Sequence, residues 1–497
     1  MASAAGLSGI PLRDFSGGPN LRDAASELAD NECVDAWNVT FDERGGAQSR
    51  LGMSKFNGTV YDAAKVQNMF DWKAGDALIV QVGAKLYKGT STTANKTFTT
   101  AARVGFAEFD GKLVVCHPVD GLFTSTDGVT FTAVADVDAP KGNALAVWQN
   151  KVWVTGLSSK VSWSDAGSVT SWTSTSFNFL REKDDETVVA LAGSSGVDIS
   201  GRPGLLAYKN ESAYRIYDSV TGDYETLDAT VGAASALSVV SVGGLTISLS
   251  KHGIFQTDGI GPLRNVSERF QPLWSPSALA FDKQSLWCAG RLGNRAYFSL
   301  PRSGEAANNL ELEYHPEQGW IAPGSAAASC YATFSAATEL LYAGSPTVNG
   351  QAYQRFSGGT DDGTAISWRF QTHWLEPNRG FQATVWQVRL HGRGKGTMTV
   401  LTDFASTGGA AYPFEYTTSS PVYDTAVYDT AVYDDPVLQA TQQFLSIGLC
   451  RQVSLKFTGS SSTTVSGPVL LGAGAGQTLG AFGLAGIDVL HVPLGIS

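Results

Sequence analysis

The sequence predicts an all-β fold: a six- or seven-bladed β-propeller followed by an antiparallel β-sandwich, with an extended N-terminal segment. Three observations predict it. Short apolar stretches separated by Gly, Asp, Asn and Ser turns run through 60–360, and no helical period persists there. These stretches recur at intervals of roughly 40 residues, which is typical of propeller blades. The 497 residues include 55 Gly, and only 16% are charged, as expected for strands buried between neighbouring sheets.

Composition excludes several classes of protein. With 43% apolar and 10% aromatic residues, the chain can bury a large core, so it is neither disordered nor a coiled coil. A net charge of -11 disfavours nucleic-acid binding through a basic face. The five cysteines are scattered and form no CxxC pair, so we expect buried free thiols in a chain made in a reducing cytoplasm. Residues 1–10 lack the pattern of a signal peptide.

The first two predicted parts are an arm and the propeller. Residues 1–59 carry few strand signals and many Asp, Asn and Arg residues, so we expect an extended arm that wraps the propeller or reaches a neighbouring ring.

Over 60–360, pairs of apolar strands joined by polar turns repeat, as in FAEFDGKLVVC (106–116). The residues just before these turns mark the repeat: Trp72, Phe109, Trp148, Val242, Phe281 and Phe334. With one more unit near Ser194, seven can be counted, but the first is weak and the fourth irregular, so six and seven blades both stay open.

The third predicted part is a sandwich over 361–497. The stretch AISWRFQTHWLEP (365–377) alternates large and polar residues, and 384–404 is expected to form two strands around a Gly-rich turn at 392–396. Further strands are expected within 442–460 and 486–495. The uncharged stretch 469–487 is long enough to cross a bilayer, but six of its 19 residues are Gly. Two short buried strands joined by a loop are therefore the preferred interpretation.

A tyrosine-aspartate repeat, PVYDTAVYDTAVYDDP, is inserted into the predicted sandwich at 421–436. Its period of five residues fits neither a strand face nor a helix face, which predicts an exposed excursion. One interpretation is a low-complexity surface loop. The other is an acidic, aromatic loop that meets a partner subunit or a channel through Tyr423, Asp424, Tyr428, Asp429, Tyr433 and Asp434.

Two turns look like the Asp boxes of sialidase-type propellers: STDGVTF (125–131) and SDAGSVTSW (164–172). In such turns the Asp accepts backbone hydrogen bonds and the Gly takes a positive φ, so that the turn joins two strands of one blade. The residues concerned are Ser125, Asp127, Gly128, Ser164, Asp165 and Gly167. The arginine cluster, tyrosine nucleophile and acid of a sialidase are not recognisable, so we interpret the turns as structural and predict that the protein is not an enzyme.

The sequence predicts no cofactor and no metal. The six histidines are isolated and lack the spacing of zinc ligands, and there is no P-loop, GxSxG or GxGxxG motif opening a helix. The basic run HGRGKG (391–396) lies in an expected hairpin turn without a helix behind it, which is weak evidence for phosphate binding. Acidic stretches at 182–186 and 361–362 could hold calcium, but solvated loops are the preferred interpretation.

The segment FSGGPNLRDAASELADNECVDAWNVTFDERGGAQSRLG (15–52) resembles the opening of a family of bacteriophage virion proteins. These are the tail nozzle or hub proteins of short-tailed phages, also described as packaged-DNA stabilisation proteins. The matching positions include Gly17, Gly18, Asn20, Arg22, Asp30, Asn31, Glu32 and Asn38. Pro19 stands where Leu is more usual. Stretch 365–377, run 391–396, the tyrosine-aspartate repeat and the closing VPLG are also similar, so the resemblance spans nearly the whole chain.

The resemblance implies a non-enzymatic component of the phage tail, made in the cytoplasm of the host bacterium. Such proteins form a ring, expected here to be a homohexamer, that continues the DNA channel below the portal and adaptor, retains packaged DNA and opens for ejection. The implied partners are an adaptor or portal-proximal tail protein, tail fibre or spike proteins, and double-stranded DNA in transient passage without sequence-specific binding. An acidic wall fits this role, because each basic contact would add a counterion-release contribution that holds the DNA.

An alternative function belongs to a different class. The propeller could bind host glycans through exposed Trp and Tyr side chains, as lectin-like propellers do, in a receptor-binding protein of the tail. A test of glycan binding separates the two hypotheses.

Overall fold

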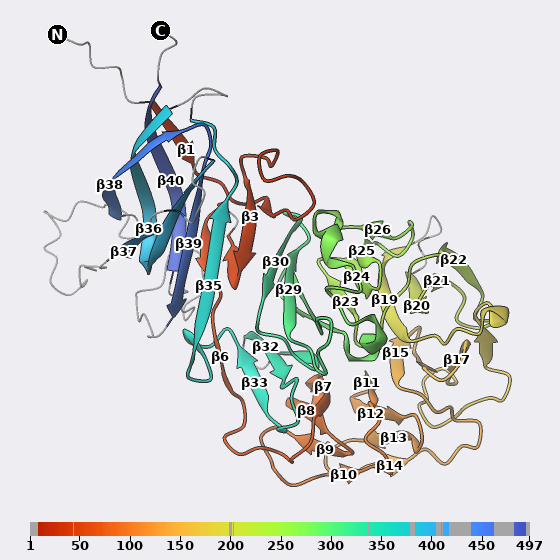
Figure 1. Cartoon of the computed structure of the whole chain (residues 1–497). Helices are drawn as coiled ribbons and strands as arrows, with labels where there is room; N and C mark the ends of the chain where they lie inside the picture. Colours follow the sequence, from red (N-terminus) through yellow and green to blue (C-terminus); the bar gives the residue numbers. More distant parts are fainter. Residues whose placement is uncertain are drawn as a thin grey trace, which may run out of the picture. The chain divides into compact units, whose positions relative to one another are not determined.

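The computed structural model describes residues 8–42, 44–197, 201, 203–335, 338–377, 383–403, 409, 411–416, 439–461 and 482–493. It confirms the predicted fold class: 49% of residues lie in strands and 4% in helices, six small sheets form the ring of a β-propeller, and a larger mixed sheet is present as well. The chain divides into two compact units (Figure 1). The propeller unit comprises Lys55–Glu317 and Ser325–Arg355, and the larger-sheet unit comprises Met1–Ser54, Gln318–Gly324 and Phe356–Ser497.

Five blades of the propeller unit are four-stranded antiparallel sheets in the described residues. The first contains β7 (Val66–Trp72), β8 (Ala77–Val82), β9 (Lys85–Lys88) and β10 (Lys96–Thr97). The second contains β11 (Gly105–Phe109), β12 (Lys112–His117), β13 (Gly121–Ser125) and β14 (Thr132–Ala133). The third contains β15 (Ala144–Trp148), β16 (Lys151–Thr155), β17 (Lys160–Trp163) and β18 (Phe177–Phe179). The fourth contains β19 (Ala190–Val197), β20 (Pro203–Tyr208), β21 (Ala213–Ile216) and β22 (Tyr224–Asp228). The fifth contains β23 (Val239–Val242), β24 (Leu245–Ser250), β25 (Gly253–Thr257) and β26 (Arg264–Asn265).

The sixth small sheet contributes three strands to the propeller unit: β27 (Cys288–Leu292), β28 (Arg295–Leu300) and β29 (Leu310–His315). Short 3₁₀ helices connect some strands: η1 (Lys73–Gly75), η2 (Glu182–Asp184), η3 (Glu268–Leu273) and η4 (Phe281–Leu286). The first strands of successive blades contact one another, so they form the innermost layer of the ring.

Apolar side chains fill the spaces between neighbouring blades. Trp148, Trp153 and Trp163 of the third blade share one buried cluster with Leu205 and Tyr214 of the fourth. The ring centroids of Trp153 and Trp163 lie 4.7 Å apart. Large flat rings suit the tapering space between two twisted sheets, which explains why a chain with few charges contains 12 Trp.

The ring is closed by β31 (Tyr331–Ser335), β32 (Glu339–Gly344) and β33 (Ala352–Arg355). Strand β31 contacts both β27 and β7, so these strands occupy the place between the sixth blade and the first. The Phe56 N–H donates to the Ala352 carbonyl at 2.9 Å, and the Gln351 amide donates to Asn57 Oδ1 at 2.8 Å. The seven units counted in the sequence therefore correspond in number to six separate small sheets and this closing unit. One marker was wrong, because Phe281 lies in η4 and the first turn of the sixth blade instead joins β27 to β28.

The larger-sheet unit contains strands from both ends of the chain. Its N-terminal strands are β1 (Ser8–Leu12), β2 (Gly18–Pro19), β3 (Glu32–Trp37), β4 (Val39–Phe41) and β5 (Ala47–Ser49), and β6 (Met53–Lys55) follows at the unit boundary in the sequence. A short middle strand is β30 (Trp320–Gly324). Its C-terminal strands are β34 (Thr360–Asp361), β35 (Thr364–Thr372), β36 (Ala383–Thr402), β37 (Ala411–Tyr416), β38 (Gln439–Cys450), β39 (Val453–Ser461) and β40 (Phe482–Pro493). The pairing of β2 with β3 is parallel, so the sheet is mixed, whereas a purely antiparallel sandwich was expected.

The first 54 residues are part of this unit, which differs from the separate extended arm expected over 1–59. Strand β3 pairs with β35, and β1 and β5 pair with β40. Phe15, Cys33, Val39 and Phe41 are buried in one core with residues of β35, β36, β39 and β40. The sequence suggested an arm because these strands are short, and their partners lie several hundred residues away.

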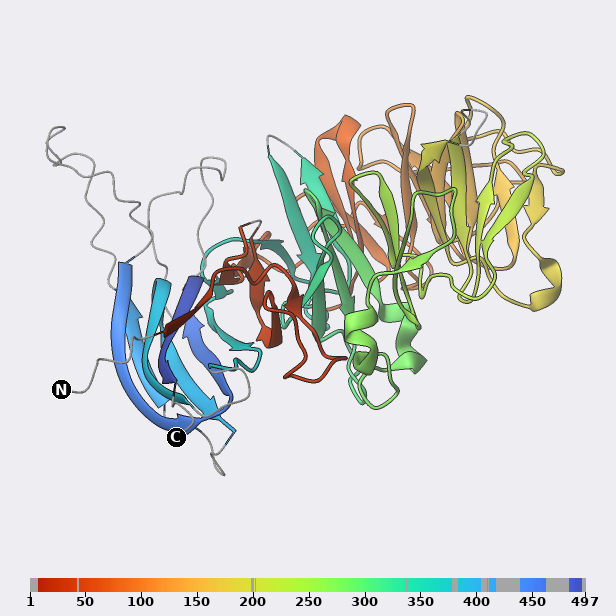
Figure 2. The same cartoon turned by 90° about the horizontal axis from the view of Figure 1, so that it is seen from above.

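Strand β36 also differs from the sequence prediction. A turn was expected at 392–396, but Ala383–Thr402 is one continuous strand. Its first part pairs with β38 and β40, and its last part pairs with β39. The long strands of this unit curve strongly (Figure 2), and the exchange of partners along β36 accompanies that curvature. The predicted alternation in β35 is confirmed, since Ile366, Trp368 and Phe370 are buried and the residues between them are exposed.

Two further expectations concern cysteine and membranes. All five cysteines are free and buried, as predicted. Within the described residues, no helix is long and apolar enough to span a bilayer. Most of the uncharged stretch 469–487 lies outside the described residues, and its last part begins β40.

Candidate functional site

The sequence-predicted residues fall into three groups. The tyrosine-aspartate repeat lies outside the described residues, and with it Tyr423, Asp424, Tyr428, Asp429, Tyr433 and Asp434. The Asp-box-like residues lie in turns of the second and third blades. The family-like N-terminal residues lie in the larger-sheet unit.

The turn after β13 is organised by Asp127. Its Oδ1 accepts the backbone N–H groups of Val129 at 2.8 Å and Thr130 at 2.7 Å, and the Ser125 hydroxyl donates to it at 2.9 Å. Gly128 has a φ of +70° and donates its N–H to Ser125 Oγ. The hydrogen bonds from Thr130 and Val129 hold the pKa of Asp127 below its ordinary value. The geometry is that of a structural turn.

We expect Asp127→Ala to open this turn. The amides of Val129 and Thr130 would lose their acceptor, so their hydrogen-exchange protection factors should fall, as measured by mass spectrometry or NMR. In the wild-type protein the same protection should be full above the ordinary carboxyl pKa of 3.8 and disappear as the pH falls through the lower pKa of the folded state. The control is Asp138→Ala, an exposed residue of the next loop; equal protection in the two variants would contradict the assigned role.

The second predicted turn is built differently. Asp165 accepts the hydroxyls of Ser171 at 2.5 Å and Thr173 at 2.9 Å, and Ser164 Oγ accepts the Val152 N–H at 2.9 Å. Gly167 has a φ of +75°.

Sequence reasoning missed a third turn, in which Asp258 accepts the N–H groups of Ile260 and Gly261 at 2.9 and 3.0 Å. The signal was present, because Thr257-Asp258-Gly259 repeats the Ser/Thr, Asp and Gly chemistry of the first turn.

Asn20 connects the first family-like residues. Its amide donates to Glu32 Oε2 at 3.1 Å and to Asp23 Oδ2 at 2.9 Å, and its Oδ1 accepts the Arg22 N–H at 3.1 Å. Asn20 and Glu32 are both buried. The Arg22 side chain lies at the surface beside Asp23, and Asp30 is exposed. These contacts fix the loop between β2 and β3.

The two neighbouring glycines are required by close approach. A Cβ at Gly17 would lie 2.8 Å from the Asn31 carbonyl oxygen, which accepts the Gly17 N–H. Gly18 has a φ of +66°, and a Cβ there would lie 2.7 Å from Trp320 Cβ. Both positions therefore favour glycine for steric reasons.

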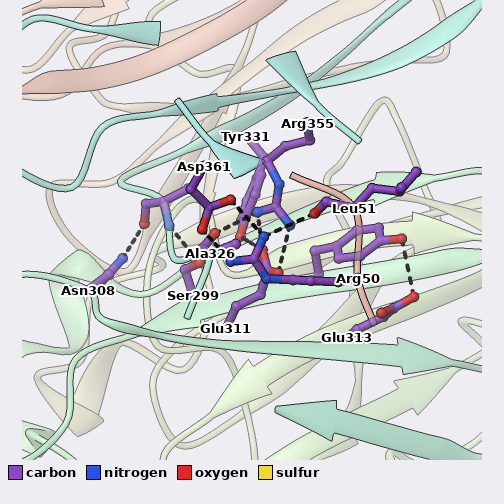
Figure 3. Close-up of polar contacts among 12 residues, drawn as sticks. Arg50, Leu51, Ser299, Asn308, Glu311, Glu313, Ala326, Tyr331, Arg355 and Asp361 are labelled. Atoms are coloured by element: carbon purple, nitrogen blue, oxygen red, sulfur yellow. Dashed lines mark hydrogen bonds and ion pairs between the residues drawn. The ribbon is translucent and has the colours of Figure 1, made fainter. Parts of the chain in front are cut away.

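Asn38 belongs to a second polar cluster, together with Arg50 and Asp361. Figure 3 shows Arg50 and Asp361 of this cluster. Asn38 has a φ of +55°, donates to the Ser367 carbonyl at 2.7 Å and accepts Arg50 Nε at 2.8 Å. Arg50 binds the Asp361 carboxylate through both terminal nitrogens, at 2.8 and 2.5 Å. Asp361 is therefore the ion-pair partner of Arg50, whereas the sequence suggested that it lies in a solvated loop.

A third polar cluster, which the sequence did not predict, lies in the propeller unit and contains Glu311 and Arg355 (Figure 3). The Arg355 guanidinium contacts both carboxylate oxygens, at 2.6 and 2.8 Å, and donates to the Ala326 carbonyl at 2.6 Å. Tyr331 donates its hydroxyl to Glu311 at 2.6 Å, so the Ser299 hydroxyl, 2.6 Å from Tyr331, must donate to Tyr331. Burial and the Glu311 charge raise the pKa of Tyr331. The cluster connects β28, β29, β31 and β33.

The described histidines do not form a metal site. No group of three or more His, Cys, Asp or Glu side chains able to hold a metal occurs among the described residues. His117 is buried, stacks on Phe98 and accepts the Asp120 N–H at 3.0 Å through Nδ1. Burial lowers the pKa of His117 and of His373. Their contacts are structural.

A cavity of about 220 Å³ lies in the central channel of the propeller. Inner strands of many blades contribute to it, including Met69 of β7, Leu145 of β15, Leu191 of β19, Val239 of β23 and Tyr331 of β31. Polar atoms contribute a larger share of its exposed surface than apolar atoms do.

No protein-family profile and no curated protein matches the chain. Many solved structures are similar to it, and three of them illustrate the level of similarity. The designed protein Ika8 has 9% identity and a TM-score of 0.37, over 61% of this chain and 99% of that one. PorZ, a bacterial surface component of the type-IX secretion system of Porphyromonas gingivalis, has 12% identity and a TM-score of 0.39, over 59% of this chain and 36% of that one. A chain of a mitotic checkpoint complex has 13% identity and a TM-score of 0.42, over 67% of this chain and 98% of that one. At these values the similarities carry no inference about function.

Proposed function

We propose that the chain is a structural protein of a phage tail, a nozzle or hub that forms a ring continuing the DNA channel and opens for genome ejection. The observation that carries the proposal is the N-terminal segment 15–52, which resembles that family. Most of the residues responsible make the contacts described for the loop between β2 and β3 and for the Asn38 cluster.

The charge of the chain supports the same proposal. With 46 Asp and Glu against 35 Lys and Arg, the chain as a whole repels phosphates, so DNA could slide past a ring of such chains with little of the counterion release that strengthens binding. The proposed ring is a homohexamer below an adaptor or portal-proximal protein, with tail fibre or spike proteins as further partners.

The alternative of glycan binding through exposed aromatic residues receives less support. Among the residues whose side chains the structure describes, the exposed large hydrophobic residues are Leu, Val and Ile, and none is Trp or Tyr. Stacking on a sugar ring requires an accessible aromatic face. A glycan array on the recombinant protein checks this, and specific binding would favour the alternative.

Removing residues 422–435 tests the nozzle function. We expect particles that assemble, because 421–436 is an insertion between strands, but that leak DNA or fail to eject it. The measurement combines electron microscopy of purified particles, the quantity of packaged DNA and infectivity. A matched control replaces the segment by a sequence of the same composition in scrambled order.

Two outcomes would contradict parts of the proposal. Normal infectivity of the deletion particles would remove the repeat from the channel function. A recombinant protein that is strictly monomeric by mass measurement, and absent from virions, would contradict the nozzle function itself.

A further inference from the structure

One face of the propeller carries a group of exposed apolar side chains. In an antiparallel meander, successive connections alternate between the two ends of the strands. The loops between the second and third strands of a blade therefore lie on the same face as the loops between blades, and we call it the inter-blade face. Five large apolar residues in these loops are between 46% and 96% exposed: Val60, Val119, Val137, Leu157 and Val348.

The five residues lie on neighbouring loops of the closing unit and the first three blades. We call these loops, 56–65, 98–104, 118–120, 134–143, 156–159 and 345–351, the apolar arc. Hydrogen bonds join each part of the arc to the next: Tyr61 N–H to the Gly350 carbonyl at 3.2 Å, Arg103 Nε to the Gln67 carbonyl at 3.0 Å, Thr99 N–H to Asp120 Oδ2 at 2.8 Å, Lys141 Nζ to the Val119 carbonyl at 2.6 Å, and Asn143 N–H to the Thr155 carbonyl at 3.1 Å. Single exposed Val or Leu residues are common, but several on one continuous surface mark an interaction site.

The apolar arc has almost no net charge. Its loops contain four Asp against two Lys and one Arg. Much of this charge is already engaged within the chain. Asp62 pairs with Lys85 at 2.8 Å, and the Asp136 carboxylate accepts the Trp172 N–H at 2.9 Å. Depletion of free charge is typical of the core of a protein interface.

The other half of the inter-blade face is different in character. The corresponding loops of the fourth, fifth and sixth blades contain eight Asp or Glu and seven Lys or Arg: 180–189, 209–212, 229–238, 251–252, 266–287 and 301–309. None of their described side chains is among the exposed large apolar residues. The face thus has an apolar half and a half with nearly balanced charge, and together they account for little of the net charge of -11.

The opposite face of the propeller does not match the apolar arc. The exposed apolar residues described there, Val129, Val220 and Ile260, lie in separate turns of the second, fourth and fifth blades. Each follows an Asp by two positions, so each lies beside a carboxylate. Covering the arc with this acidic face would remove those carboxylates from water without a counter-charge. Within the described part of the propeller, the surface that best complements the arc is the arc itself.

We propose that the apolar arc is the interface through which two copies of this chain associate about a two-fold axis. In such a pair the same patch of both copies is in contact, so the exposed Val and Leu side chains of one arc are removed from water by those of the other. Two chains of charge -11 repel each other, and the nearly neutral inter-blade face is where they approach at least cost. The pairing is independent of the function proposed above, because it uses one face of the propeller and requires no ring.

Sedimentation velocity of the full chain over a range of concentrations tests the pairing. We expect a reversible equilibrium between monomer and dimer. Val137→Glu combined with Leu157→Glu should raise the dissociation constant at least about tenfold, because unpaired like charges would face each other across the axis. The matched control combines Val220→Glu with Ile260→Glu, which adds the same charge on the opposite face and should leave the constant unchanged. All four positions are exposed, so both variants should keep the wild-type melting temperature.

Salt separates apolar association from ionic association. Raising NaCl from about 0.1 M to about 1 M shortens the screening length from about 10 Å to about 3 Å and should leave the dimer intact, since apolar contacts are not screened. A wild-type chain that stays monomeric, equal dissociation constants for the two double variants, or dissociation of the dimer at high salt would each overturn the pairing. A hexamer that neither double variant disrupts would overturn the pairing but leave the proposed ring intact, whereas a dimer absent from virions would contradict only the nozzle function.

Discussion

Replacing Arg355 by methionine is expected to lower the free energy of unfolding of the propeller unit by about 3–5 kcal/mol. Arg355 is 1% exposed and Glu311 is 4% exposed, so the substitution leaves a carboxylate buried without its counter-charge. The Ala326 carbonyl loses a donor as well. Because the pair connects β29 with β33, the loss should loosen the closing strands first. Urea denaturation measures the free energy, and hydrogen exchange in β31–β33 locates the effect.

The control for this variant is a surface ion pair of the same propeller. Arg291 lies 3.3 Å from Glu339, and both side chains are more than a third exposed. Arg291→Met should therefore change the free energy of unfolding by less than about 1 kcal/mol. A loss for Arg355→Met no greater than that for Arg291→Met would show that the buried pair does not hold the ring closed.

The second large effect is expected for Phe41→Ala in the larger-sheet unit. Phe41 is completely buried and packs edge-to-face on Trp320, with ring centroids 5.5 Å apart. Its ring also lies near Phe370 of β35. Removing it creates a cavity in the shared core, so we expect a loss of about 3–5 kcal/mol in the free energy of unfolding of this unit. The backbone amides of β35 and β39 should exchange hydrogen faster in the variant, which would locate the destabilisation in this core.

Leu21→Ala is the matched control, because Leu21 belongs to the same N-terminal segment and is 40% exposed. A change within about 0.5 kcal/mol is expected for this surface position. If Phe41→Ala had an equally small effect, residues 1–54 would behave as the separate arm that the sequence suggested.

Local chemistry made part of the candidate sites predictable. The Asp127 turn follows from Ser, Asp and Gly at fixed spacing, because its hydrogen bonds join residues at most three positions apart. The bond between Arg50 and Asp361 joins residues 311 positions apart, and nothing in the short sequence Asp361-Asp362 indicates its partner. The Glu311 cluster was missed for the same reason, since its members come from four strands.

The sequence by itself determined the all-β class, the repeated blades, the alternation of β35 and the five free thiols. Each depends on strand periodicity, turn residues or composition, which act over a few positions. Only the tertiary structure decided that 1–54 belongs with the C-terminal strands, that β36 is continuous and that Arg355 binds Glu311. Those features arise from pairing between distant segments, whose free energy depends on which surfaces the complete fold brings together.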